Sequence, residues 1–143
     1  MIKPNDLRIG NVLKRYDGEI VIVENINEAG INGEFDLCWS TYIYNELSGI
    51  PLTEEWLLKF GFEKGIQKAS TNTMYFDKKY NNTNLYYILV DKFPDCSIYL
   101  YVELLQSELC LRDIKYVHQL QNLIFALTGE ELILNTEKCQ TEE

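Results

Sequence analysis

The chain has 143 residues, of which 46% are hydrophobic and 24% are charged, and its formal net charge is −9. This much apolar material can bury a core without disulfides or metals, which argues against general disorder and favours one domain or two small lobes. The longest apolar runs fall far short of the ~20 residues of a membrane helix, and residues 1–6 lack the apolar stretch of a secretory signal. We therefore expect a cytoplasmic protein.

Residues 1–50 are expected to form a small β lobe of short strands joined by turns. Strands are predicted at 9–16 and 19–24, with a return through 35–39. Asp17-Gly18 suits a two-residue type I′ hairpin, because both central residues of that turn need positive φ. The pattern predicts a three- or four-stranded meander, and Gly30 and Gly33 suggest that it curls into an SH3-like barrel.

Residues 53–62 are typical of a complete short helix. Thr53 can cap its first turn through the side-chain hydroxyl, and two glutamates then follow where the helix dipole favours negative charge. Gly61 can supply the left-handed residue after the last turn, and Phe62 can fold back in a Schellman arrangement. Trp56 and Phe60 share a face with Leu57 by their spacing.

The rest of the chain predicts an antiparallel sheet followed by a longer helix. Strands are expected at 73–77, 84–92, 97–104 and 108–112, with short connections that require antiparallel pairing. Asp113 is expected to cap a helix through Thr128, Gly129 to end it, and residues 132–134 to add a short strand. This helix would pack on the apolar face of the sheet, which makes the fold class α+β.

The expected domain organisation therefore has three parts. Residues 1–50 form the small β lobe; residues 51–134 form the short helix, the antiparallel sheet and the C-terminal helix; residues 135–143 form a disordered tail, because they are polar and lack aromatic residues.

No catalytic, cofactor or metal site is predicted. The chain has a single histidine, His118, and its cysteines show no C-x-x-C spacing: they are Cys38, Cys96, Cys110 and Cys139. We expect three of them to be buried as small hydrophobic residues and His118 to lie on the surface of its helix or half-buried in a satisfied environment. Phosphate-binding glycine motifs are absent from the sequence.

Tyrosines are the more suggestive residues. The 10 tyrosines cluster between Tyr75 and Tyr101, and Tyr86, Tyr99 and Tyr101 are expected to form a row on the sheet face away from the long helix. Tyrosine is favoured at binding surfaces. This row could contact a partner protein, stack single-stranded bases, be covered by the N-terminal lobe, or form a homodimer.

Three blocks resemble a family of small uncharacterised proteins carried by gut anaerobes and their phages or other mobile elements. They are residues 6–11 (DLRIGN), 50–62 (IPLTEEWLLKFGF) and 114–123 (IKYVHQLQNL), the last continuing into 125–132 (FALTGEEL). The resemblance runs from residue 6 to 132, although 65–112 match only in pattern. The family has no established activity, so the resemblance implies a mobile-element setting and cytoplasmic residence.

The expected function is that of a non-enzymatic interaction protein of a phage or mobile element. The acidic charge permits a partner with a basic surface and disfavours generic nucleic-acid binding, since no basic cluster occurs. The alternative is a nucleic-acid-binding accessory module that uses Lys3, Arg8, Lys14 and Arg15 of the β lobe. No small-molecule substrate is evident, and an enzyme would need a pocket that gathers residues scattered in the sequence.

Overall fold

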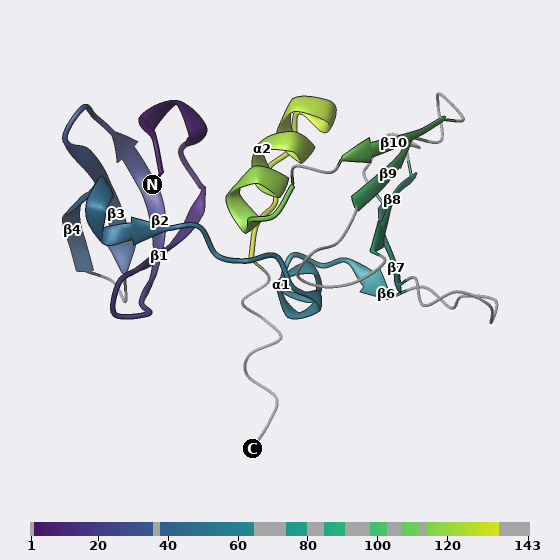
Figure 1. Ribbon diagram of the computed structural model, residues 1–143, viewed down its shortest axis with the longest axis horizontal. Coiled ribbons are helices and arrows are strands. Elements are labelled where there is room, and N and C mark those ends of the chain that lie inside the picture. Colours follow the sequence, from purple (N-terminus) through teal and green to yellow (C-terminus); the bar gives the residue numbers. More distant parts are fainter. Residues whose placement is uncertain are drawn as a thin grey trace, which may run out of the picture. The chain divides into compact units, whose positions relative to one another are not determined.

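The structure is a computed structural model that describes residues 2–35, 38–64, 74–79, 85–90, 98–102, 107–111 and 114–134, with side chains for 2–33, 40–64, 76 and 114–134. The chain divides into two compact units (Figure 1). The first unit combines Met1–Pro51 with Tyr116–Leu132, and the second combines Leu52–Lys115 with Ile133–Glu143. Both units contain an antiparallel sheet and a helix, which confirms the α+β class.

The sheet of the first unit has the strand order β4-β3-β2-β1-β5. The hairpin between its first two strands is confirmed, but the loop has three residues rather than two, because the Arg15 N–H donates to the Glu19 carbonyl. Gly18 takes the positive φ of 93° that such a loop needs. The strand bounds are Val12–Arg15 (β1), Ile20–Ile26 (β2), Gly30–Phe35 (β3), Cys38–Ile43 (β4) and Leu47–Ser48 (β5).

This sheet is open, whereas an SH3-like barrel was expected. Among the described residues, no pairing joins the outer strands β4 and β5. The two glycines of β3 serve close packing: a Cβ on Gly33 would lie 2.5 Å from a Val21 methyl, and one on Gly30 would lie 1.9 Å from the Tyr42 carbonyl oxygen. Their small size therefore lets neighbouring strands and side chains approach, without closing the sheet.

One face of the sheet carries the core of the first unit. Along β2, Val21 and Val23 are fully buried while Ile22 between them is 38% exposed, which is the period-2 alternation of a strand with one covered face. Ile2 and Leu7, on either side of the 3-10 turn η1 (Pro4–Asp6), complete this core. The buried residues of the core are Ile2, Leu7, Leu13, Val21, Val23, Ile31, Tyr42 and Leu47.

Helix α2 (Val117–Thr128) groups with the first unit, whereas the sequence was expected to group it with residues 51–134. It also begins later than expected: Tyr116, not Asp113, is its N-cap, and the Tyr116 N–H donates to the Gln119 side chain at 3.1 Å. The reason is that Tyr116 still pairs with Pro51 as an isolated β-bridge. The expected C-terminus is confirmed, since Gly129 is left-handed with φ of 72°.

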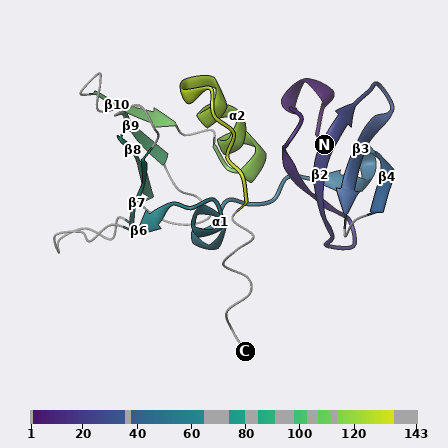
Figure 2. The same ribbon diagram turned by 180° about the vertical axis from the view of Figure 1, so that it is seen from behind.

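The second unit contains helix α1 (Glu54–Lys59) and a sheet of order β10-β9-β8-β7-β6, seen from behind in Figure 2. The four predicted strands are confirmed within a few residues, and β6 was not predicted. The strand bounds are Glu63–Lys64 (β6), Met74–Lys79 (β7), Leu85–Val90 (β8), Ile98–Val102 (β9) and Ser107–Leu111 (β10).

The predicted end of α1 is confirmed in detail. Phe62 N–H donates to the Leu57 carbonyl and Gly61 N–H to the Leu58 carbonyl, both at 3.0 Å, which is the Schellman pattern. Thr53 is the N-cap residue as expected, but its hydroxyl makes no capping hydrogen bond. Phe60 is fully buried, so the helix carries an apolar side despite its six residues.

Residues 132–134 are not in a strand, contrary to the expectation, and residues 135–143 lie outside the described part of the chain. Within the described ranges, the structure contains no helix with the length and apolar character needed to cross a bilayer.

We predict that Gly30→Ala destabilises the first unit much more than Gly129→Ala. The Gly129 site has no neighbouring atom within 4 Å, so an alanine there costs only the left-handed backbone, about 1 kcal/mol. At Gly30 the new methyl meets backbone, and a cost of about 3 kcal/mol or more is expected. Urea unfolding of both variants tests this, and equal midpoints would contradict the packing described for β3.

Candidate binding pocket

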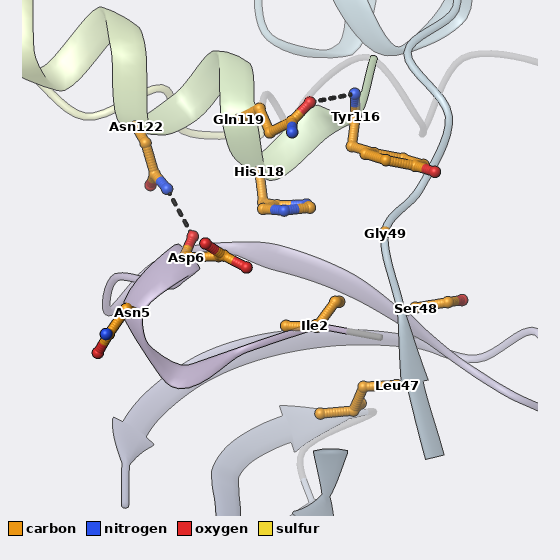
Figure 3. Close-up of a pocket in the computed structure, with 10 residues that line it drawn as sticks. All are labelled: Ile2, Asn5, Asp6, Leu47, Ser48, Gly49, Tyr116, His118, Gln119 and Asn122. Carbon is orange, nitrogen blue, oxygen red and sulfur yellow. Dashed lines mark hydrogen bonds between the residues drawn. The ribbon is translucent and has the colours of Figure 1, made fainter. Parts of the chain in front are cut away.

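A surface pocket of about 510 Å³ lies wholly within the first unit. We call it the His118 pocket. Figure 3 shows that it is bordered by η1 on one side, by the segment that follows β5 on another, and by the first turns of α2. Its lining residues are Ile2, Asn5, Asp6, Leu47, Ser48, Gly49, Tyr116, His118, Gln119 and Asn122.

The side-chain amide of Gln121 holds α2 in the position that forms this pocket. Gln121 is 1% exposed, and its Oε1 accepts the Val12 N–H at 2.9 Å. Its Nε2 donates to the carbonyls of Gly10 at 3.0 Å and Leu132 at 3.4 Å. The amide therefore satisfies three backbone groups from two stretches of the chain, residues 10–12 and Leu132, which links the helix to the start of β1.

A second pair of amides joins α2 to η1. Asn122 donates from Nδ2 to the Asp6 carbonyl at 2.9 Å, the bond drawn in Figure 3, and its Oδ1 accepts from Asn11 at 2.9 Å. Asn11 is 1% exposed and accepts the Arg8 N–H at 2.7 Å. These bonds fix the η1 segment, and with it Asn5 and Asp6, opposite the start of the helix.

An ion pair lies just beyond the C-terminal end of the same helix. Arg8 donates to Glu131 at 2.6 Å, and its guanidinium lies 3.5 Å from the centre of the Phe125 ring. Both charged side chains are partly exposed, so the pair itself adds little stability. The Arg8 cation is therefore already paired with an acidic side chain of the same unit.

The His118 imidazole is the central group of the pocket. It is 4% exposed, and its Nδ1 has no hydrogen-bond partner. The ring stacks on Tyr116 with centroids 5.8 Å apart and planes 15° apart. A Cβ on Gly49 would lie 2.8 Å from the Tyr116 ring and 3.0 Å from His118 Cε1, so glycine leaves the room that the two rings occupy.

Burial lowers the pKa of His118 below its usual value, because the cation is poorly solvated there, while the negative charge of Asp6 opposes that shift. The imidazole is therefore neutral at pH 7, with one nitrogen that can accept a hydrogen bond and one that can donate. An unpartnered buried nitrogen is uncommon in proteins.

The polar groups of the pocket are rich in acceptors. Asp6 is the only charged residue among the ten described residues that line it. Its carboxylate receives one N–H, from Lys3 at 3.3 Å, and so keeps acceptor capacity. The Ser48 hydroxyl donates to the Lys14 carbonyl at 3.3 Å and points away from Asp6 and His118 in Figure 3. The pocket suits a group that donates hydrogen bonds and carries no negative charge.

The tyrosines predicted as a partner surface lie elsewhere, and their side chains fall outside the described part of the chain. The backbone register pairs Tyr101 with Tyr87, and Tyr86 with Val102. Directly opposed residues of an antiparallel pair share a face. The expected row of Tyr86, Tyr99 and Tyr101 therefore stays a prediction.

All four cysteines also fall outside the described side chains, so the expectation for them remains a prediction. His118 was expected on the helix surface or half-buried and satisfied; it is buried, and its Nδ1 is unpartnered. Sequence reasoning did not find Asp6, Gly49 or Tyr116 as its neighbours. The sequence held one signal of a buried polar site. His118 and Gln121 are polar, lie three residues apart, and so fall on the same side of α2 as its apolar residues.

Comparison with known proteins adds no relative. No protein-family model, no curated protein and no solved structure matches this chain.

We predict that Gln121→Leu loosens the contact between α2 and β1. The change leaves the buried Val12 N–H without an acceptor, at a cost of roughly 2 kcal/mol in unfolding free energy. Amide hydrogen exchange gives the local reading: the Val12 amide should exchange faster, whereas the Tyr16 amide, which donates to Glu46 at 2.9 Å, should change less. Unchanged protection of Val12 would show that Gln121 does not hold it.

We predict that the His118 imidazole titrates below 6.5 in the folded protein, because burial lowers its pKa. The unfolded chain then binds more protons than the folded one, so stability falls as the pH drops below about 6.5. NMR of the ring measures the pKa directly, since the chain has one histidine. Urea unfolding from pH 7.5 to 5 should show a smaller pH slope in His118→Gln; an identical slope would contradict the burial.

Proposed function

We propose that this chain is a non-enzymatic protein-interaction protein that binds a basic segment of its partner in the His118 pocket. The observation that carries the proposal is the composition of the pocket: its described lining residues include one carboxylate, several neutral polar side chains and no lysine or arginine. The resemblance to proteins of phages and mobile elements adds the suggestion that the partner is a host protein.

The charge of the whole chain supports the same choice. A net charge of −9 draws cationic partners toward the surface and raises their association rate. Within the pocket, Asp6 would supply a specific contact for a positive group, while Ile2 and Leu47 would cover its apolar stem.

The nucleic-acid alternative has less support. Two of its four cations are already matched by acidic neighbours: Arg8 by Glu131 at 2.6 Å, and Arg15 by Asp17 at 3.2 Å and Glu19 at 3.3 Å. Phosphate binding depends on cations that release counterions, and a paired arginine contributes less to it. We therefore prefer a basic protein segment as the partner.

An array of basic, neutral and acidic peptides tests the proposal with the full chain. We predict that basic peptides bind best and that Asp6→Asn lowers their binding affinity about tenfold, because a charge-assisted hydrogen bond is lost. Glu28→Gln is the matched control: it removes one exposed charge from the same unit, outside the pocket. It should change binding little.

Two results would count against the proposal. If Asp6→Asn and Glu28→Gln weakened binding equally, the effect would be one of overall charge and the pocket would have no role. If the double variant Tyr99→Ala/Tyr101→Ala abolished binding while Asp6→Asn retained it, the contact surface would lie on the second sheet.

A further inference from the structure

The size of the His118 pocket limits what can fill it. At about 510 Å³ it is far larger than a single ion or water molecule and lies in the range of sites that take an organic group. Its apolar residues, Ile2 and Leu47, lie beside polar ones from η1, as Figure 3 shows. A long side chain with an apolar stem and a polar head matches this mixture.

The carboxylate of Asp6, from η1, is the charged acceptor among the described residues that line the pocket. A guanidinium carries five N–H donors in a planar fork that matches the two oxygens of a carboxylate, whereas an ammonium is a compact point charge with three donors. A carboxylate acceptor therefore favours the guanidinium.

The aromatic ring at the pocket favours the same group. Tyr116 is 39% exposed and lines the pocket, so part of its ring is accessible to a bound group. Guanidinium groups stack on aromatic rings more readily than ammonium groups do. Among the described residues the same unit contains three such pairs: Arg8 with Phe125 at 3.5 Å, Arg15 with Tyr16 at 4.8 Å and Arg15 with Tyr42 at 5.8 Å.

From these observations we propose that the His118 pocket is an arginine-recognition site: the guanidinium of a partner's arginine donates to the Asp6 carboxylate and lies against Tyr116. This rests on the proposed function and names the residue type that the basic segment must contain. Lysine would match the charge but has no planar fork of N–H groups for the carboxylate and the ring.

The test is an NMR titration of the full chain with N-acetyl-arginine amide, followed at the His118 ring, whose signals are unique in the chain. The matched probes are N-acetyl-lysine amide, which keeps the charge, and N-acetyl-citrulline amide, which keeps the shape without the charge. We expect a saturable shift with the arginine probe, at least fivefold weaker binding of the lysine probe, and weaker binding still of the citrulline probe.

Variants complete the test. Asp6→Asn should lower the affinity for the arginine probe about tenfold, and Tyr116→Leu should lower it several-fold. Glu28→Gln should leave the affinity unchanged. Backbone spectra confirm that each variant is folded. Equal binding of the lysine or citrulline probe, a shift that does not saturate, or insensitivity to Asp6→Asn would each overturn the proposal.

The two proposals fail separately. If the chain binds basic peptides of the array through Asp6 without preferring arginine to lysine, arginine recognition is wrong and the protein-binding function stands. If the arginine probe binds the pocket but no basic peptide does, the site is confirmed and the protein-binding function is wrong.

Discussion

The buried amide of Gln121 is the contact on which the arrangement of the first unit depends. A buried polar group must be hydrogen-bonded, and this one satisfies Val12, Gly10 and Leu132 in one orientation of the helix. That orientation sets the rotation of α2. His118, three residues earlier, is thereby placed on the side that borders η1.

The same constraint explains why the pocket is polar. Asn122 reaches across to the Asp6 carbonyl, so the turn that carries Asp6 is fixed opposite the histidine. Burial lowers the pKa of His118 and keeps the ring neutral, and its Nδ1 remains unpartnered. Leaving a buried nitrogen without a hydrogen bond costs free energy. We place ligand recognition here because Asp6 is the only charged residue among the described residues that line the pocket.

Local chemistry made part of the fold predictable. The Schellman end of α1 follows from Gly61 and Phe62 alone, because its hydrogen bonds close within six residues. The strands of both sheets follow from runs of β-branched and aromatic residues bounded by turns. The start of α2 was mispredicted because Tyr116 forms a bridge to Pro51, a partner 65 positions away in the chain.

The sequence by itself therefore determined the α+β class, the ends of both helices at glycines and most strand positions, since these depend on neighbours within a few residues. Only the tertiary structure decided that α2 groups with the N-terminal strands, that the first sheet stays open, and that Asp6 faces His118. The place of α2 and the position of Asp6 depend on hydrogen bonds between segments more than 100 residues apart, such as Val12 with Gln121, and the open sheet depends on which strands pair at its edges. Periodicity carries no information about such pairings.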